Sequence, residues 1–470
     1  MARAKPWQRL AGPGGRDVAL AALHDVHTHH VFVREACERI IAQRGTTPTE
    51  AGLAYELATG VVRHRLTLDC LILQRFTGKP SRLDATVRDV LRLGVYQLLY
   101  TDRIPDFAAV NEAVEQSKRV AGRPAGGLVN AILRGVLTRR EPERIPWSDK
   151  PDANTIRIDA TRAWHFTEPV LPDRADNLIE HLSAATSHPV ELVKRWVTQF
   201  GAAEAETALW CGTFRPPLIL RVNRLRCTAD ELVASLRQND VEAVAVADAV
   251  YVVGDAGPLE RLDAFTQGLC QPQDPTAMAV VRDARPRDCK RILDLCAAPG
   301  TKATRAAELR KDRGTIIATD RDADRLAQID ANCRRLGIQS IRTVAPGKLG
   351  AVVEEEGAFD LIFVDAPCSN TGVLSRRPEA RYRVDNESLA SLADKQVELL
   401  IRAAALADER ARIVYSTCSL EREENEQVIE KFVRQDDGWE VTRSERVFPR
   451  SGGEVTDWCD GGFTAELVRS

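Results

Sequence analysis

Apolar residues recur at helical spacing through the first part of this 470-residue chain. Between residues 87 and 99 they stand at positions 87, 90, 91, 95, 98 and 99, which together form one face of an α-helix. Similar stripes begin at Val110 and at Leu128, and alternating β-branched runs are scarce. The pattern therefore predicts an all-α bundle over residues 1–145.

The hydrophobic pattern changes after this bundle. Residues 146–168 are rich in Pro, Asp and Arg and have no periodicity, so we expect a linker there. Residues 169–268 begin with two helical stretches. They continue with strands near 216–223 and 250–253 around a helix, which predicts a small α+β module.

From residue 269 to residue 470 the chain alternates between short apolar runs and helical stretches. Helices follow most of the runs, and strands are expected at 291–295, 315–319, 340–344, 361–364 and 412–415. This alternation predicts a doubly wound, mostly parallel α/β sheet of the Rossmann-like kind. Ligands of such a sheet bind at the carboxyl ends of its strands.

Composition narrows the class of protein. The chain is 44% hydrophobic and 28% charged, and it has no apolar run long enough to span a membrane. Residues 1–16 are polar and basic, which predicts no secretory signal. Eleven cysteines at scattered spacings suit free thiols in a reducing cytoplasm, and a net charge of −3 restricts any RNA contact to local basic patches.

Metal binding has little support in the sequence. No Cys-x-x-Cys pair occurs, which argues against structural zinc. His24, His27, His29 and His30 form a cluster that either binds a metal or lies on the solvated face of an N-terminal helix. Without cysteine partners nearby we favour the solvated face and expect no metal.

The first strand of the α/β region is followed by DLCAAPGTK at residues 294–302. Small residues and a glycine let the backbone approach a ligand, and the next helix offers free N–H groups. Asp320 follows the second strand, where an acid commonly accepts hydrogen bonds from a ribose. The arrangement predicts a nucleoside ligand held by Asp320 and by Cys296, Ala297, Ala298, Pro299, Gly300, Thr301 and Lys302. For Lys302, contact with substrate and simple capping of the helix remain alternatives.

Two cysteines stand fifty residues apart after apolar runs, Cys368 in DAPCS and Cys418 in STCS. Because both follow strands of one sheet, we expect their thiols to face a common cleft. A buried cysteine often only fills space, but two cysteines with separate flanking motifs favour covalent catalysis.

The motifs around these cysteines resemble the RNA 5-methylcytosine methyltransferase family. They are DAPCS at 365–369, TGV at 371–373, YSTCSL at 415–420 and EENE at 423–426. The front of the chain resembles the NusB-like RNA-binding bundle through GVVR at 60–63, RIP at 103–105, VNEAV at 110–114 and VNAILR at 129–134. Together they are similar to the ribosomal RNA small-subunit methyltransferase B group.

The resemblance implies a reaction and roles for three residues. A methyl group would pass from S-adenosylmethionine to carbon 5 of a cytidine in 16S ribosomal RNA. By resemblance Cys418 attacks carbon 6, Cys368 assists product release, and Asp365 hydrogen-bonds the base near nitrogen 3 and also lies among the cofactor residues. A thiol suits the attack because part of it is thiolate at neutral pH.

Five polar side chains are candidates for RNA contact. Arg221 and Asn223 end a predicted strand, where RNA contact and an ordinary exposed pair are equally open. Arg376, Arg377 and Arg381 belong to a basic loop with one aromatic residue just after Cys368. Its position favours an RNA-backbone clamp over a solvated loop.

The chain departs from the family pattern in four places. Thr301 replaces a second glycine, Thr276 replaces a serine, and 460–463 lacks one of two paired aromatics. The run 344–347 lacks the acid that usually holds the adenine end of the cofactor, so we expect no such contact there.

The leading expectation is a monomeric, cytoplasmic rRNA methyltransferase. Two alternatives remain, a methyltransferase that acts on transfer RNA and a non-catalytic RNA-binding scaffold. The intact cysteine pair argues against the scaffold.

Overall fold

The computed structural model describes residues 12–148 and 152–469. Residues 1–11 and 149–151 lie outside the described residues. The first range is most of the segment expected to carry no secretory signal, and the second is part of the expected linker. The chain divides into two compact units. Unit 1 comprises Met1–Arg215 and Leu374–Tyr382, and unit 2 comprises Pro216–Val373 and Arg383–Ser470. Each unit is described by itself.

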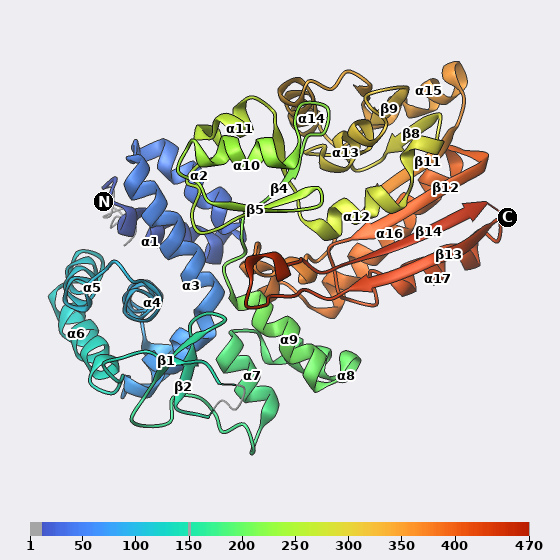
Figure 1. Cartoon of the computed structure of the whole chain (residues 1–470). Coiled ribbons are helices and arrows are strands. Elements are labelled where there is room, and N and C mark those ends of the chain that lie inside the picture. Colours follow the sequence, from blue (N-terminus) through green and yellow to red (C-terminus); the bar gives the residue numbers. More distant parts are fainter. Residues whose placement is uncertain (1–11, 149–151, 470) are drawn as a thin grey trace, which may run out of the picture. The chain divides into compact units, whose positions relative to one another are not determined.

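Unit 1 begins with the predicted helical bundle, drawn blue to cyan in Figure 1. The apolar stripe on α4 is buried along its whole length, so this face of the helix contributes to the core of the bundle. Asp84 caps the start of α4 by accepting from the N–H groups of Thr86 and Val87. The helices are α1 (Gly15–His29), α2 (Val33–Arg44), α3 (Pro48–Arg75), α4 (Ala85–Tyr100), α5 (Asp106–Ala121) and α6 (Arg123–Leu137).

The described part of the segment expected to be a linker forms short strands with its neighbouring residues. It contains β1 (Ile145–Pro146), β2 (Thr155–Arg157) and β3 (Arg162–His165), which pair antiparallel in the order β1-β3-β2. Trp164 and Phe166 are buried. The strands are too short to produce a visible alternation, and this is why the polar composition suggested a linker.

Three helices of the expected α+β module belong to compact unit 1. They are α7 (Leu178–Thr186), α8 (Val190–Phe200) and α9 (Ala202–Thr213). The compact units thus divide after Arg215, whereas the sequence pattern placed a boundary at residue 168.

Unit 2 opens with a small antiparallel sheet in the order β5-β6-β4-β7. Leu232 and Leu236 of a single long helix pack with Leu220, Val222 and Val250 of the sheet. The elements are β4 (Ile219–Val222), α10 (Ala229–Arg237), β5 (Ala243–Val246), β6 (Ala249–Val252), α11 (Asp263–Thr266) and β7 (Cys270–Pro272).

The rest of unit 2 is a seven-stranded sheet in the order β10-β9-β8-β11-β12-β14-β13. The first five of these strands are parallel, and β14 runs antiparallel to both of its neighbours. The strands are β8 (Arg291–Asp294), β9 (Thr315–Ala318), β10 (Ile341–Thr343), β11 (Phe359–Asp365), β12 (Ala407–Thr417), β13 (Trp439–Val447) and β14 (Gly462–Arg469). The strand order reverses between β8 and β11, and such a switch point leaves a crevice for ligands.

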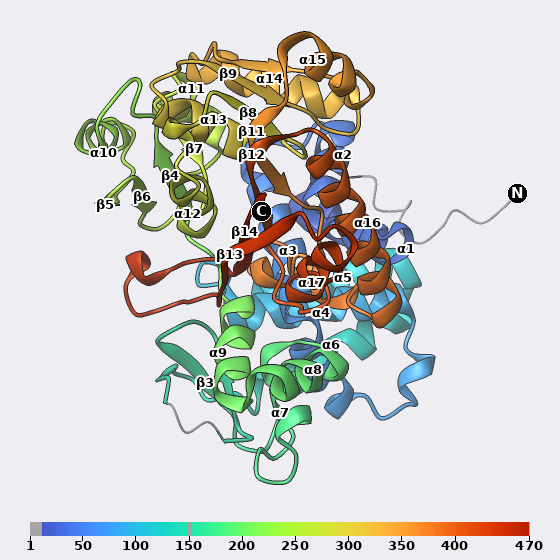
Figure 2. The same ribbon diagram turned by 90° about the vertical axis from the view of Figure 1, so that its right-hand side faces the viewer.

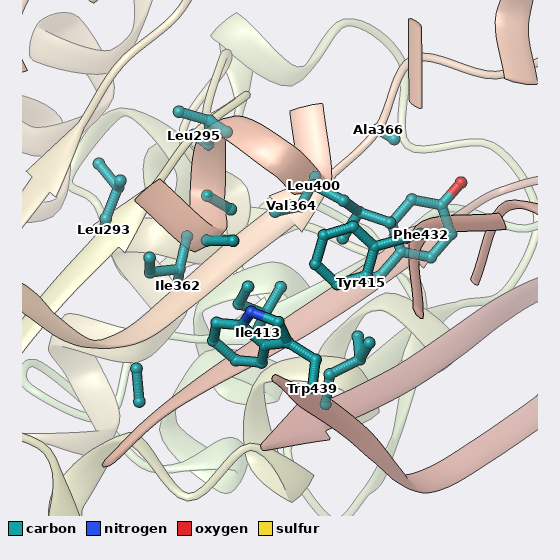
Figure 3. Close-up of a cluster of buried hydrophobic side chains, with 14 of the residues drawn as sticks. Leu293, Leu295, Ile362, Val364, Ala366, Leu400, Ile413, Tyr415, Phe432 and Trp439 are labelled. Carbon is teal, nitrogen blue, oxygen red and sulfur yellow. The ribbon is translucent and has the colours of Figure 1, made fainter. Parts of the chain in front are cut away.

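Helices cover both faces of this sheet, as the doubly wound pattern predicts. One core joins the sheet to α15 (Leu349–Glu356), α16 (Asn386–Ala405) and α17 (Glu426–Gln435), the last two lying on the same face in Figure 2. Leu293, Ile362 and Tyr415 point into it (Figure 3). The other core uses alternate strand residues with α12 (Pro275–Asp283), α13 (Thr301–Leu309) and α14 (Ala323–Leu336). Within the described residues, none of the helices has the length and hydropathy of a membrane span.

Candidate active site

The two cysteines of the sequence motifs lie together in unit 2. They follow the neighbouring parallel strands β11 and β12, in which Asp365 stands opposite Ser416. Their Sγ atoms are 3.1 Å apart, close enough for one thiol to hydrogen-bond the other. The structure therefore brings together the two thiols that the sequence predicted would share a cleft.

The environment of Cys368 keeps its thiol protonated. The hydrogen bond with Cys418 raises the pKa of Cys368 well above its usual value, and burial raises it further. Cys418 also donates to Oδ1 of Asn370, at 3.4 Å. Asn370 has a left-handed backbone (φ 64°), and its amide donates to the Cys368 carbonyl at 2.8 Å. The sequence analysis did not single out Asn370.

Glu424 cross-links the two cysteine segments. Its carboxylate accepts hydrogen bonds from the main-chain N–H of Ser369 (2.8 Å) and from the hydroxyls of Ser369 and Ser419. Gln396 of α16 donates to the same carboxylate at 3.1 Å. Burial raises the pKa of Glu424, and these hydrogen bonds act in the opposite direction. The EENE motif contained this residue, but only the fold reveals its partners.

Asp365 is held from two sides at the end of β11. Lys302 forms an ion pair with it (Nζ to Oδ2, 2.6 Å), and Ser416 donates its hydroxyl to Oδ1 at 2.9 Å. Of the alternatives for Lys302, the structure shows its ammonium directed at Asp365.

The loop after β8 approaches the ends of the neighbouring strands. Gly300 precedes α13 with φ 96°, a conformation that glycine adopts without strain. Asp320 accepts a hydrogen bond from the Ala298 N–H at 2.9 Å and pairs with Arg325 at 2.7 Å. Burial raises the pKa of Cys296 to about 12, so this thiol is unreactive at neutral pH.

Asp294 ends β8 beneath this loop and is fully buried. Neither carboxylate oxygen has a hydrogen-bond partner of ordinary geometry among the described residues. Burial, reinforced by the negative charge of Asp365, raises the pKa of Asp294 to about 7, while Lys302 and the Ala303 N–H lower it in part. A fully buried acid with so little hydrogen bonding is a feature that the sequence pattern could not reveal.

The departures from the family pattern have visible structural consequences. Thr276 donates its hydroxyl to the Asp460 carbonyl at 2.7 Å, so the threonine still ties α12 to the C-terminal segment. After β10 the chain turns through Pro346–Lys348, and the Pro346 carbonyl accepts from Arg402 at 2.6 Å. No acidic residue occurs in this turn.

Three of the five RNA candidates are corrected by the structure. Arg221 is fully buried and pairs with Glu308 at 2.6 Å, and Asn223 is buried and donates to the carbonyls of Gly268 and Leu336. Arg381 is 1% exposed and donates to main-chain carbonyls. These side chains are used inside the fold, because buried polar groups need partners. Only Arg376 and Arg377 of the five are exposed.

Two histidines of the cluster lie beside carboxylates of unit 1. His27 Nδ1 lies 3.3 Å from Asp89, and His29 Nδ1 lies 3.3 Å from Asp25. Among the residues that the structure describes, no group of three or more His, Cys, Asp or Glu is arranged to hold a metal ion.

Family models match three parts of the chain. The model described as 16S rRNA methyltransferase RsmB/F matches residues 282–452, and the NusB family matches residues 14–138. A ferredoxin-like domain of RsmF/B-like methyltransferases matches residues 188–254. These matches confirm the predicted NusB-like bundle, the small α+β module and the methyltransferase resemblance.

Whole-chain comparisons agree with the family models. A probable ribosomal RNA small subunit methyltransferase B of Bacillus subtilis (strain 168) is 30% identical over 89% of this chain and 88% of its own length. Its counterpart in Klebsiella pneumoniae subsp. pneumoniae is 30% identical over 91% and 92%. The solved structure of PH0851 covers 97% of this chain and 98% of its own, with a TM-score of 0.72 at 22% identity. NSun6 from Pyrococcus horikoshii, solved with SFG, covers 60% and 98% with a TM-score of 0.53 at 21% identity. The two solved structures thus confirm the fold.

Proposed function

The chain belongs to the ribosomal RNA small subunit methyltransferase B family, and we propose that it methylates carbon 5 of a cytidine in 16S ribosomal RNA with S-adenosylmethionine. The observation that carries this proposal is the pair Cys368 and Cys418, 3.1 Å apart beside Asp365. Carbon 5 of cytosine is a weak nucleophile, so the base must be activated before it can accept a methyl group.

Cys418 provides the activation. Its sulfur adds to carbon 6, which breaks the conjugation of the ring and makes carbon 5 enamine-like. Bound S-adenosylmethionine supplies the methyl group that carbon 5 then takes. Loss of the carbon-5 proton restores the double bond, the bond between sulfur and carbon 6 breaks, and Cys418 leaves as a thiolate. The base must leave any stacked helix to reach the thiol.

Cys368 changes its role as the reaction proceeds. In the free enzyme it keeps its proton, which it can donate toward the sulfur of Cys418. Once Cys418 is bonded to carbon 6, its sulfur is a thioether and accepts at most a weak hydrogen bond from Cys368. The largest cause of the raised pKa of Cys368 then disappears, which lets this thiol release its proton to solvent and, as a thiolate, accept the carbon-5 proton while the product is released.

We assign Asp365 to holding the target base. Its two oxygens have acceptor capacity beyond the bonds from Lys302 and Ser416, since a carboxylate offers about four acceptor positions. A hydrogen bond to nitrogen 3 favours protonation there and offsets the charge that builds during the attack.

The residues after β8, β9 and β11 fit the proposed cofactor. S-adenosylmethionine carries an ammonium group, a sulfonium and ribose hydroxyls, which suit acids and free N–H groups. Within the described residues, Asp294 and the hydroxyl of Thr319 are buried at these strand ends without a hydrogen-bond partner of ordinary geometry, and Asp320 has further acceptor capacity. We assign the site to Cys296, Ala297, Ala298, Pro299, Gly300, Thr301, Lys302, Asp320 and Asp365, and add Asp294.

The RNA contact is proposed for the exposed arginines of the Leu374–Tyr382 segment. Arg376 and Arg377 are exposed, and the guanidinium of Arg377 lies 5.1 Å from the centre of the Phe32 ring. Positive groups of this kind bind phosphates without reading sequence.

Two cysteine variants test the reaction. Cys418→Ala should abolish formation of 5-methylcytidine in 16S rRNA from cells that lack the gene, measured by mass spectrometry of nucleosides and by bisulfite sequencing. Cys368→Ala should accumulate a covalent protein–RNA adduct, seen as a slow band on a denaturing gel. Cys227→Ala is the matched control, because this half-buried thiol donates to the Leu269 carbonyl in the α+β module and has no role in the proposed reaction. Full activity of Cys418→Ala would reject the proposed nucleophile.

A further inference from the structure

Each cysteine of the pair is followed directly by a serine, and both serines bind one carboxylate. The hydroxyls of Ser369 and Ser419 donate to the same oxygen, Oε2 of Glu424, and they also lie 3.1 Å from each other. All of these residues belong to unit 2. The contact between the two sulfurs is therefore accompanied by a second contact between the same chain segments, one residue further along each of them.

The acceptor positions of Glu424 are filled by donors from this part of the fold. Its Oε1 accepts from the main-chain N–H of Ser369 at 2.8 Å and from the side-chain amide of Gln396 at 3.1 Å. Together with the two serine hydroxyls on Oε2, these donors occupy the roughly four acceptor positions of an ionised carboxylate. Glu424 is fully buried, and hydrogen bonds of this kind compensate a buried charge for its lost hydration. The carboxylate is thus used to hold the two segments together rather than to accept a proton from a substrate.

Gln396 ties the same carboxylate to the other side of Cys368. Its amide also donates to the carbonyl of Pro367 at 2.9 Å, and its side chain is fully buried. Pro367 precedes Cys368 and Ser369 follows it, so both neighbours of this cysteine are bound to the pair of Glu424 and Gln396. The helix α16, which carries Gln396, packs on the sheet in the same core as β11 and β12 and so provides a fixed base.

The neighbours of Cys418 are bound in a similar way by the residue after Glu424. The hydroxyl of Thr417 donates to Oδ1 of Asn425 at 2.6 Å, and the amide of Asn425 donates to the Ser419 carbonyl at 3.0 Å. Thr417 and Ser419 flank Cys418, and all of these side chains are buried. Both cysteines are therefore held through their neighbours by one short segment of the chain.

We propose that Glu424 is a positioning residue for methyl transfer: through the serines that follow the two cysteines, it holds Cys368 and Cys418 at the separation that the reaction needs. Gln396 completes this cross-link from α16. Most of the proposed cofactor residues follow β8 and β9 instead, so a loosened pair should slow the chemical step without weakening cofactor binding. This inference rests on the proposed function, since it gives both thiols a part in one reaction.

The first test measures methyl transfer by variants of the full-length protein. We expect the kcat of Glu424→Ala per S-adenosylmethionine-binding site to fall about 10- to 100-fold, with the KM for S-adenosylmethionine within about twofold of wild type. Glu424→Gln should recover part of kcat, because the serine hydroxyls can accept from its amide as well as donate. Ser419→Ala removes one bond to the carboxylate and should show a smaller loss, and it replaces Glu424→Ala in both tests if that variant does not fold.

The second test measures the separation of the thiols without the reaction. In a glutathione buffer the two thiols pass two electrons and two protons to oxidised glutathione, which becomes two reduced molecules, while a disulfide joins Cys368 and Cys418. The equilibrium constant depends on how closely the fold holds the two sulfurs. In Glu424→Ala it should fall about 10-fold, equivalent to about 30 mV in the reduction potential of the pair. Mass spectrometry of the two cysteine peptides after acid quenching gives the fraction in the disulfide.

Asp360→Asn is the matched control. Asp360 also belongs to β11, but it accepts the main-chain N–H groups of Lys290 and Arg291 at the opposite end of the strand from Cys368. This variant should leave kcat per binding site and the glutathione equilibrium unchanged. An unchanged kcat or an unchanged equilibrium in folded Glu424→Ala, or equal changes in Asp360→Asn, would overturn the inference. If the wild-type protein forms no 5-methylcytidine, the proposed function fails instead, and an unchanged equilibrium would still reject the positioning role.

Discussion

Replacing Asp294 by Asn should make the free protein more stable at neutral and alkaline pH. Asp294 is fully buried at the end of β8, where the described part of the chain gives it no hydrogen-bond partner of ordinary geometry, and its pKa rises from an ordinary 3.8 to about 7. The native carboxyl therefore keeps its proton to a higher pH than the unfolded chain does. Its contribution to stability is complete below about pH 4 and is lost as the pH rises toward about 7.

The size of the effect follows from that pKa difference. Each pKa unit corresponds to about 1.4 kcal/mol, so ionising Asp294 in the fold costs about 4 kcal/mol in all. About 3 kcal/mol of this falls between about pH 5 and about pH 8. Asn has nearly the same shape and does not titrate, so it should add a constant change at every pH. The free energy of unfolding of Asp294→Asn, relative to wild type, should increase by about 3 kcal/mol across this window.

Urea denaturation of both proteins, followed by tryptophan fluorescence at several pH values, measures this difference. Other titrating groups are present in both proteins and cancel in the comparison. A difference between the two proteins that stays flat with pH, or that turns against the Asn variant as the pH rises, would refute the buried-acid explanation. Added S-adenosylmethionine should stabilise wild type more than the variant, because its ammonium group would pair with the ionised acid.

The remaining predictions concern the cross-links of unit 2. Glu424→Ala should lower the free energy of unfolding by about 3–5 kcal/mol, since it leaves several buried donors unpaired; Glu424→Gln should cost less, and calorimetry would compare them. Arg221→Met should lower the free energy of unfolding by roughly 3–5 kcal/mol, because it leaves the buried Glu308 carboxylate without its cation. RNA affinity, measured by filter binding, should stay at the wild-type value. Hydrogen peroxide should oxidise Cys368 or Cys418 to a sulfenic acid that condenses with the other thiol, releasing water; activity should then return with dithiothreitol, and mass spectrometry should find the disulfide.

The sequence predicted the parallel strands well because they are buried on both faces. Residues 361–364 and 412–415 are continuous apolar runs, and they form the centres of β11 and β12. The sequence analysis did not identify β13 and β14. Most side chains of β13 are exposed at the edge of the sheet, so its run of polar residues carries no core signal.

The candidate site was predictable only where residue type and chain position determine the chemistry. Cys368, Cys418 and Asp365 all end adjacent parallel strands, so their meeting follows from the topology. The roles of Glu424 and Asn370 depend on contacts between two loops about fifty residues apart. Such contacts cannot be predicted from the periodicity or the spacing of residues in the sequence.

The arginines show why composition alone misassigns RNA contacts. The sequence does not distinguish an arginine that contacts RNA from an arginine that binds main-chain carbonyls. The two differ only in the groups that their guanidinium contacts in the fold. Arg376 is exposed, whereas Arg381, five residues later, meets three carbonyl-rich helix positions of unit 1. Helix ends need donors as strongly as phosphates do, so a basic loop that follows a catalytic motif can serve either need. In this chain the buried Arg381 binds helix carbonyls, and only the exposed Arg376 and Arg377 remain candidates for RNA contact.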